Sequence, residues 1–292
     1  MTIAIFGSPY PEHFSKYIQH LIKKLESEHI KLIIEDEFSL FLANNIRFNK
    51  PFATFNSYET LKNKADFLFS IGGDGTLLKA VTYVRDSDIS ILGINTGRLG
   101  FISSVSAGQI DDSITDILKG NYKINERTLL KLSTKKNLFK DSNFALNEVA
   151  VSKKDTSSMI RIDAYVDDEF LNTYWADGLV VSTPTGSTGY SLSCGGPIIM
   201  PGTNNIIITP NAPHNLNVRP IVIDDSSLIK LKVEDRDQLA MVSLDSRSRA
   251  FDSDTELTIQ KAKFKTKLIQ PQNNSFTSTI RNKLMWGLDK RS

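Results

Sequence analysis

The sequence contains a single cysteine, Cys194, so no disulfide bond can form within the chain. A chain without disulfides is typical of a reducing compartment and unlike the small secreted scaffolds that disulfides stabilise. No histidine stands near Cys194 to activate its thiol. We therefore expect a small buried residue at this position.

Histidine is also scarce, and its four residues show no H-E-x-x-H or other metal-ligand spacing. No window holds the roughly 18 apolar residues that a membrane span requires. The N-terminal residues lack a basic region followed by an apolar run, so we predict no secretory signal. These absences favour a cytoplasmic protein without a zinc site of its own.

The chain also lacks an excess of either charge, because 35 basic and 33 acidic residues leave a formal net charge of +2. Proteins that bind nucleic acid or a membrane surface usually carry a basic block. We therefore predict no nucleic-acid partner and no membrane partner. Hydrophobic content of 40% and charged content of 23% are typical of a soluble globular protein.

The first third of the chain alternates apolar strand-like runs with amphipathic helical segments. Strands are predicted at residues 2–7, 30–35, 65–71 and 89–94, and helices at 14–25, at 76–84 and over about a dozen residues ending at 119–120. This alternation predicts a doubly wound α/β domain with a parallel sheet over residues 1–120.

After Gly120 the chain consists of short runs rich in β-branched residues that turn-forming residues separate. This pattern predicts an antiparallel, β-rich and sandwich-like domain over residues 121–276. Helical spacing returns at Ile280, Leu284 and Leu288. We expect residues 277–292 to form a C-terminal helical segment that packs back on the body of the protein.

The motif "GGDGT" at residues 72–76 follows a buried strand and opens a helix. Glycines at such a position let backbone N–H groups approach a phosphate, and the helix N-terminus favours an anion. We predict a phosphate loop made of Gly72, Gly73, Gly75 and Thr76. The alternative is a tight turn in which Asp74 only caps the helix, although a cap would not need glycine on both sides.

The pair Asn147 and Glu148 interrupts an otherwise apolar strand over residues 144–152. Neighbours on a strand point to opposite faces, so one of the two would face the core unless a bulge or a ligand intervenes. A carboxylate beside an amide suits the vicinal hydroxyls of a ribose. The alternative is a strand end whose polar residues bond to a neighbouring loop.

Two further segments have the composition of ligand loops. Residues 175–198 are dominated by Thr, Ser, Gly and Pro beside a buried strand, and the spacing of a serine-hydrolase elbow is absent. Residues 93–101, "GINTGRLGF", carry several glycines at the end of the fourth predicted strand. Phe101 could stack on a flat ring or be an ordinary core residue.

Together these segments resemble the NAD kinase family, in its bacterial form, over essentially the whole chain. The resemblance rests on "GGDGT" at 72–76, the loop at 93–101, "NEV" at 147–149, the stretch at 177–198 and "LDS" at 244–246. It implies transfer of the ATP γ-phosphoryl group to the adenosine ribose 2′-hydroxyl of NAD, giving NADP. It also implies a divalent cation, Mg²⁺, without a fixed protein site, and a homodimer or homotetramer.

The resemblance also assigns roles to residues. Asp74 matches the catalytic acid that accepts a proton. The positions that match NAD-binding residues are Asp74, Gly75, Lys79, Phe101, Asn147, Glu148, Asp177, Thr185, Thr188, Gly189, Tyr190, Ser191, Leu192, Ser193 and Arg247. Gly189 stands where the family often has alanine, which is a tolerable change at a position of close approach.

Two other functions are compatible with parts of this pattern. A kinase for a lipid or sugar hydroxyl could share the "GGDG" loop, although a lipid substrate calls for an apolar or basic surface that the sequence does not show. A nucleotide sensor without catalysis is the other alternative, against which the intact Asp74 and its flanking glycines argue.

Overall fold

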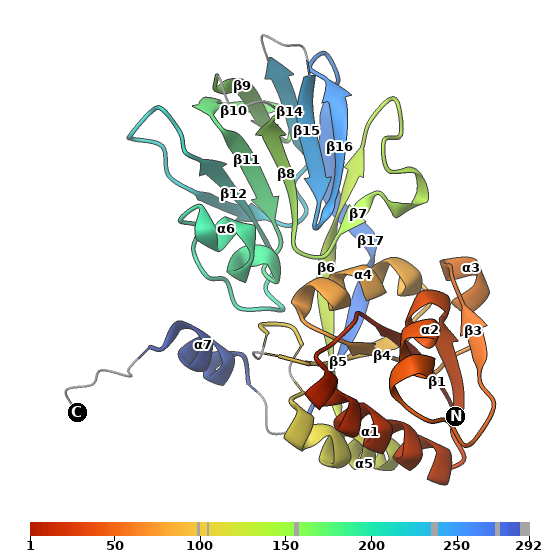
Figure 1. Cartoon of the computed structure of the whole chain (residues 1–292). Coiled ribbons are helices and arrows are strands. Elements are labelled where there is room, and N and C mark those ends of the chain that lie inside the picture. The colour runs from red at the N-terminus through yellow and green to blue at the C-terminus, as the bar shows by residue number, and fades with distance from the viewer. Residues whose placement is uncertain (98–99, 104, 155–157, 235–238, 272–274, 287–292) are drawn as a thin grey trace. The chain divides into compact units, whose positions relative to one another are not determined.

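A computed structural model describes the chain except for residues 98–99, 104, 155–157, 235–238, 272–274 and 287–292 (Figure 1). It divides into two compact units. The first consists of Met1–Glu126 with Thr266–Ser292, and the second of Arg127–Lys265. Among the described residues, none of the helices is both long enough and apolar enough to span a membrane.

The first unit is built on a parallel sheet with the strand order β5-β4-β1-β2-β3. Its strands are β1 (Thr2–Gly7), β2 (Lys31–Glu35), β3 (Ala53–Phe55), β4 (Phe67–Ile71) and β5 (Ser90–Ile94). The central strands are apolar and buried, as expected where helices cover both faces. The predicted doubly wound α/β arrangement is therefore confirmed.

Helices α1 and α5 lie below this sheet in Figure 1, and α4 lies above it. The helices of the unit are α1 (Ser15–Ser27), α2 (Asp36–Asn45), α3 (Tyr58–Leu61), α4 (Asp74–Val84), α5 (Ile110–Lys119) and α7 (Phe276–Leu284). In α1 the buried residues Ile18, Leu21, Ile22 and Leu25 recur at helical spacing, which is the face that the sequence predicted.

The elements α2, β3 and α3 were not predicted from the sequence. Helix α2 buries only a few residues, and its start depends on the side chain of Glu35, which accepts the N–H of Phe38. Strand β3 has three residues, two of them exposed. Helix α2 has too few buried residues to show a clear helical repeat, and β3 and α3, with three and four residues, are too short to show any.

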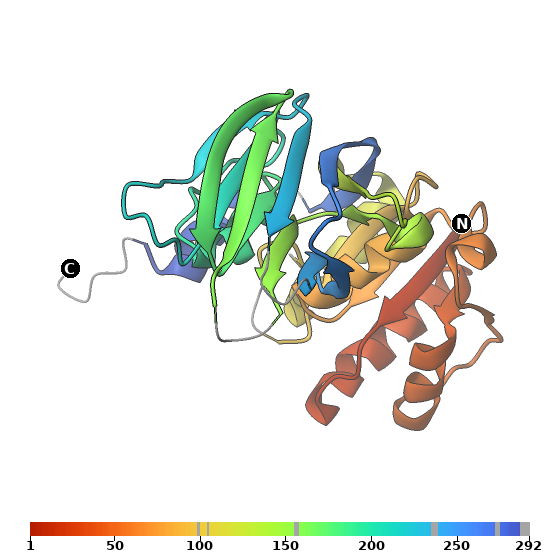
Figure 2. The ribbon, with the colours of Figure 1, turned by 90° about the horizontal axis from the view of Figure 1, so that it is seen from above.

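The second unit contains two antiparallel sheets around one apolar core. One has the order β13-β12-β11-β8-β15-β16, and the other places β9 between β10 and β14, which in turn pairs with β17. Figure 2 shows these strands from above. The bounds are β6 (Lys123–Ser133), β7 (Phe144–Ala145), β8 (Glu148–Lys153), β9 (Ile160–Val166), β10 (Glu169–Ala176), β11 (Gly178–Ser182), β12 (Asn205–Asn211), β13 (Ile221–Asp224), β14 (Ile229–Glu234), β15 (Leu239–Leu244), β16 (Arg247–Asp252) and β17 (Leu257–Gln270), with the short helix α6 at Tyr190–Ser193.

This β-rich unit confirms the second half of the predicted fold class. Strands β10 and β16 were missed, because only two residues of β10 are buried and β16 has the polar sequence "RSRAFD". Strand β17 continues into the first unit, where Leu268 pairs in parallel with Ile91.

The predicted C-terminal helix is present as α7, and its Ile280 is buried. It ends at Leu284, within the predicted segment of residues 277–292, because Met285 adopts a left-handed conformation with φ of 56°. Residues 287–292 of the predicted segment lie outside the described residues. The ammonium group of Lys283 lies 5.5 Å from the centre of the Phe101 ring, so α7 packs on the loop that follows β5.

Candidate functional site

The "GGDGT" loop joins β4 to α4 at the carboxyl end of the parallel sheet. Gly72 has a φ of 151°, and a Cβ atom there would lie 2.2 Å from the Thr76 hydroxyl oxygen, so only glycine fits. Among the residues that the structure describes, a Cβ atom added to Gly73 or Gly75 would meet no atom within 4 Å. Both glycines are exposed, so this turn presents open backbone to solvent, as a phosphate loop requires.

The Asp74 carboxylate is held by three successive backbone N–H groups of the loop after β5. Phe101 donates to Oδ2 at 2.7 Å, while Ile102 and Ser103 donate to Oδ1 at 3.1 and 2.8 Å. The N-cap of α4 is Gly73, and Asp74 is the first residue of the helix. The side chain of Asp74 thus holds a neighbouring loop in place. The alternative in which Asp74 only caps the helix did not predict this contact.

Gly100 makes this arrangement possible, because a Cβ atom there would lie 1.9 Å from Asp74 Oδ1. The glycine-rich loop at 93–101 was predicted to approach a ligand, and it approaches Asp74 itself. Phe101 is half-buried rather than part of the core, and Lys283 covers one face of its ring. Two residues of this loop, 98 and 99, lie outside the described residues.

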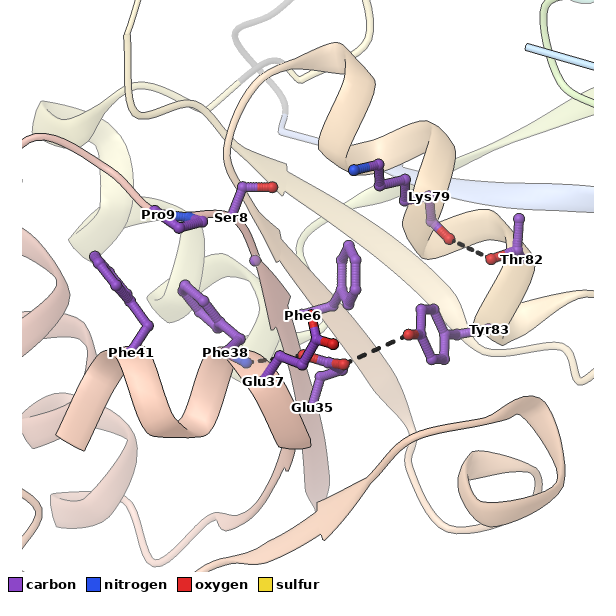
Figure 3. Close-up of a pocket in the computed structure, with 11 residues that line it drawn as sticks. Phe6, Ser8, Pro9, Glu35, Glu37, Phe38, Phe41, Lys79, Thr82 and Tyr83 are labelled. Atoms are coloured by element: carbon purple, nitrogen blue, oxygen red, sulfur yellow. Dashed lines mark hydrogen bonds between the residues drawn. The ribbon is translucent and has the colours of Figure 1, made fainter. Parts of the chain in front are cut away.

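Lys79 lies on the exposed surface of α4, a little over one turn beyond Asp74. It lines a cavity of the first unit, where Figure 3 shows its ammonium group on the same side as Ser8. The sequence predicted the lysine but not the cavity.

In the second unit, Asp245 explains why the predicted strand at 144–152 is broken into β7 and β8. Its carboxylate accepts the backbone N–H groups of Leu146, Asn147 and Glu148 at 3.0, 2.8 and 3.3 Å. These N–H groups are therefore turned toward the β15–β16 hairpin. The prediction of one continuous strand was wrong, because a side chain takes the bonds that a neighbouring strand would have taken.

Both Asn147 and Glu148 are buried, each with 8% of its surface exposed. Among the described residues, no hydrogen-bond partner is found for Asn147 Oδ1 or Glu148 Oε2. Burial, and then the nearby Asp245, raise the pKa of Glu148 to about 8, against a lowering contribution from the Tyr190 backbone. Buried acceptors without donors are costly, and ligand hydroxyls would satisfy them.

The stretch after β11 packs directly on this polar pair. A Cβ atom at Gly186 would lie 2.0 Å from the carbonyl oxygen of Asn147. A Cβ atom at Gly189 would lie 3.0 Å from Glu148 Oε2 and 3.3 Å from Asn147 Nδ2. Both glycines therefore bring the backbone close to the Asn–Glu pair, as the composition of this stretch suggested.

The other predicted residues of the stretch differ in exposure. Tyr190 is 40% exposed, and its hydroxyl accepts a hydrogen bond from Asn211 at 3.0 Å. Ser191 is buried and its hydroxyl lies 2.9 Å from that of Thr209. Thr185 is buried, Thr188 and Leu192 are half-buried, and Ser193 is exposed.

Cys194 is only half-buried, so the expectation of a buried cysteine was wrong. It directly follows α6 and stands between two exposed residues, Ser193 and Gly195. Burial raises the pKa of its thiol, with a further contribution from Glu148. A raised pKa disfavours the reactive thiolate form.

Asp177 lies apart from the Asn–Glu pair, whereas Arg247 lies 4.0 Å from Asp245, the residue that binds the backbone of the pair. Asp177 precedes β11 and forms an ion pair of 2.7 Å with Lys153, whereas Glu148 pairs with the opposite end of β11, at Ser182. The backbones of Asp177 and Glu148 are thus separated by about the length of that strand, roughly 15 Å. The Arg247 guanidinium donates to the carbonyl oxygens of Ser142, at 2.5 Å, and of Phe144.

Sequence reasoning missed two residues that shape the sites, Asp245 and Gly100. Asp245 belonged to the quoted motif "LDS", and its position in a hairpin turn was the signal that it bonds to backbone. Its φ of 52° fits an aspartate in such a turn. Among the described residues, no group of three or more His, Cys, Asp or Glu side chains could hold a metal ion.

Comparison with protein families finds two adjoining domain models. The ATP-NAD kinase N-terminal domain matches residues 3–122, and the ATP-NAD kinase C-terminal domain matches residues 146–271. A protein named NAD kinase from Cytophaga hutchinsonii is 47% identical over 293 residues, with 100% of each chain covered. One from Bacteroides fragilis is 43% identical over 291 residues, again with 100% of each covered.

Solved structures give the same result. Yeast NADH kinase complexed with NADH superposes with a TM-score of 0.88 and 24% identity, covering 100% of this chain and 89% of that one. At this identity the likeness concerns the fold. An NAD kinase from Archaeoglobus fulgidus in complex with ATP superposes with a TM-score of 0.76 and 26% identity, covering 98% and 99%.

Proposed function

We propose that Asp74 accepts a proton during phosphoryl transfer, because this chain belongs to the NAD kinase family, whose members phosphorylate NAD to NADP with ATP. A ribose hydroxyl is a weak nucleophile at neutral pH and needs a positioned base. The observation that supports Asp74 is its place beside the open "GGDGT" backbone, held by three N–H groups. A carboxylate has about four lone pairs, so one remains to accept the hydroxyl proton.

The backbone bonds also set the geometry of this base. Two of them occupy Oδ1 and one occupies Oδ2, so the remaining lone pair belongs to Oδ2. Holding the carboxylate in one orientation removes the cost of arranging it in each catalytic cycle. Gly75 and Lys79, on the same helix, are proposed to contact NAD next to this oxygen, and Phe101 to contact its flat ring.

We further propose that the buried acceptors of the second unit bind NAD. Asn147 Oδ1 and Glu148 Oε2 need donors, and vicinal ribose hydroxyls supply them. The segment from Thr185 to Ser193 contributes backbone at Gly189 and a half-exposed ring at Tyr190, which suit a nucleoside. Asp177 and Arg247 are also proposed to bind NAD, and this proposal rests on the family resemblance alone.

Phosphate groups are proposed to contact the exposed backbone of Gly73 and Gly75 at the positive end of α4. A divalent cation fits as the companion of ATP, because Asp74 has only one free lone pair and the neighbouring loop residues offer no second carboxylate. When bound, the cation neutralises phosphate charge. The resemblance also leads us to propose a homodimer or homotetramer.

The Asp74→Asn variant tests the central claim. General-base catalysis typically contributes about 10²–10⁴ in rate, so kcat for NADP formation should fall by that factor. The affinity for NAD, measured by calorimetry, should stay within about threefold, because the other NAD contacts remain. An amide nitrogen meets backbone N–H groups poorly, so a small loss of melting temperature is expected too.

Asp112→Asn is the matched control, since Asp112 is also an aspartate in the first turn of a helix of this unit and is exposed. It should behave as the parent chain in kcat, NAD affinity and melting temperature. Near-normal turnover of Asp74→Asn would contradict the base role. Tight NAD binding by the parent chain without any NADP production would instead favour a sensor.

A further inference from the structure

A cavity of about 400 Å³ lies in the first unit where β1 and β2 end, beside the middle of α4 (Figure 3). Ligand pockets in proteins usually begin at about 300 Å³, so it is large enough for a small organic group. The resemblance and the comparisons assign no role to this cavity as a whole. Of its lining residues, only Lys79 was predicted from the sequence.

One end of the cavity is aromatic. The rings of Phe6 and Tyr83 have centroids 5.0 Å apart, and those of Phe38 and Phe41 lie stacked at 5.9 Å. A Cβ atom at Gly7 would lie 2.3 Å from the Phe38 ring, so this glycine lets the ring close against the end of β1. Phe41 and Tyr83 are half-buried and offer ring surface to a planar group.

The same end carries acceptors for hydrogen bonds. Glu35 accepts the N–H of Phe38 through Oε2 at 2.8 Å, and its Oε1 lies 3.5 Å from the Tyr83 hydroxyl. Burial and the nearby Glu35 raise the pKa of Tyr83 to about 12, so this hydroxyl stays protonated. The exposed carboxylate of Glu37 has no hydrogen-bond or ion-pair partner among the described residues, and it lines the cavity.

The opposite end leads to the phosphate loop. The Ser8 hydroxyl lies 3.0 Å from that of Thr76, the last residue of "GGDGT". Figure 3 shows Ser8 and Lys79 on one side of the cavity and Glu35 and Glu37 on the other. The cavity therefore runs from negative charge and aromatic rings to a cation beside open backbone.

We propose that this cavity binds the base and ribose of a nucleoside triphosphate donor, with the triphosphate directed past Lys79 toward "GGDGT". A purine supplies what the cavity lacks, namely a flat ring for the aromatic walls and an amine that donates to Glu37. The carboxylates would repel a bare polyphosphate from that end. The inference rests on the proposed function, because it takes the transferred phosphoryl group to lie at the phosphate loop.

Two substitutions test the cavity without touching Asp74 or Lys79. Glu37→Ala removes the free acceptor, and Thr82→Trp fills the space from the half-buried face of α4. Asp36→Ala is the control, because Asp36 also lies in the first turn of α2 but does not line the cavity. Calorimetry measures the Kd of NAD alone. With NAD present, it then measures the Kd of the analogue adenosine 5′-(β,γ-imido)triphosphate and of inorganic tripolyphosphate.

We expect both variants to weaken the analogue about tenfold while the Kd values of tripolyphosphate and NAD stay within about twofold, and we expect Asp36→Ala to match the parent chain. The GTP analogue should show the same loss if the cavity accepts purines in general. Unchanged analogue binding in both variants would overturn the proposal, and so would an equal loss for tripolyphosphate. These binding measurements do not depend on turnover, so they remain decisive even if Asp74→Asn contradicts the base role.

Discussion

The two units of this chain each contain an aspartate that accepts three successive backbone N–H groups. In the first unit, Asp74 receives them from residues 101–103 at 2.7–3.1 Å. In the second unit, Asp245 receives them from residues 146–148 at 2.8–3.3 Å. The local chemistry is nearly the same, so the two sites differ mainly in their surroundings.

The two aspartates differ in how far their side chains are exposed to solvent. The Asp245 side chain is 4% exposed, and burial raises its pKa although the three N–H groups and Arg247 lower it. Asp74 is half-exposed beside open glycine backbone. We call a carboxylate that accepts three successive backbone N–H groups, together with those groups, a cradle. The comparison indicates that such a cradle can stabilise the fold when it is buried, and can orient a reactive carboxylate when it is open to solvent.

Gly100→Ala disturbs the backbone N–H groups that hold Asp74 and should lower activity, although less than Asp74→Asn, which removes the carboxylate itself. The new Cβ atom would lie 1.9 Å from Asp74 Oδ1, so the loop must move away from the carboxylate. A displacement of about 1 Å at a catalytic group can cost about 10²-fold. We expect kcat for NADP formation to fall by about 10–100-fold in a steady-state assay.

Gly97→Ala is the matched control within the same loop. Within the described part of the chain, the nearest atom to a Cβ atom there would be Asn95 Oδ1, at 3.9 Å. The control should keep kcat within about twofold. Equal losses in the two alanine variants would show that loop flexibility, rather than the orientation of Asp74, matters for turnover.

Asp245→Asn breaks the buried cradle and should act on stability first. An amide can accept from only some of the three N–H groups, and leaving a buried donor unpaired costs about 1–3 kcal/mol. We expect a lower free energy of unfolding in a denaturant titration, together with a higher KM for NAD, because Asn147 and Glu148 depend on this cradle.

Asp254→Asn serves as its control, since Asp254 is exposed on the same unit and accepts no backbone bond among those described. It should leave the unfolding curve in place. If Asp245→Asn instead lowered kcat as strongly as Gly100→Ala while leaving stability unchanged, the division of roles between the two aspartates would be wrong.

The contrast also shows what the sequence could predict. The parallel sheet and helix α1 follow from periodicity, because apolar residues repeat over several turns or fill whole buried strands. The "GGDGT" loop was recognisable because its glycine pattern is local. Gly72 adopts a positive φ and lies too close to Thr76 for any side chain to fit, and both residues belong to the same five-residue motif. Each of these signals is contained in one short segment.

The cradles could not be predicted, because they join segments far apart in the chain. Asp74 meets residues 27–29 positions away, and Asp245 meets residues 97–99 positions away. The quoted motif "LDS" indicated that Asp245 mattered without showing what it bonds. The break between β7 and β8 was missed for the same reason, since it is imposed by a distant side chain.

The pH dependence of stability sharpens the comparison further, through Glu148, the residue whose backbone Asp245 holds. Its pKa is raised from 4.5 to about 8, chiefly by burial. Between these two values the folded state binds a proton that the unfolded state has lost, so Glu148 makes stability fall as pH rises through this window. Below pH 4.5 its contribution is fully present, and above about pH 8 it is lost.

Glu148→Gln removes this titration, so the variant should gain melting temperature relative to the parent chain as pH rises from 5 toward 9. A gain of at least about 1 kcal/mol would appear as roughly 2–4 °C in thermal scans at fixed pH steps. Glu169→Gln, which changes an exposed glutamate of the same unit, should follow the parent profile. Parallel curves for Glu148→Gln and the parent chain would mean that Glu148 is already ionised at neutral pH. Its free oxygen would then be a charged acceptor before NAD arrives, and the buried cradle would resemble the open one more closely than their exposures suggest.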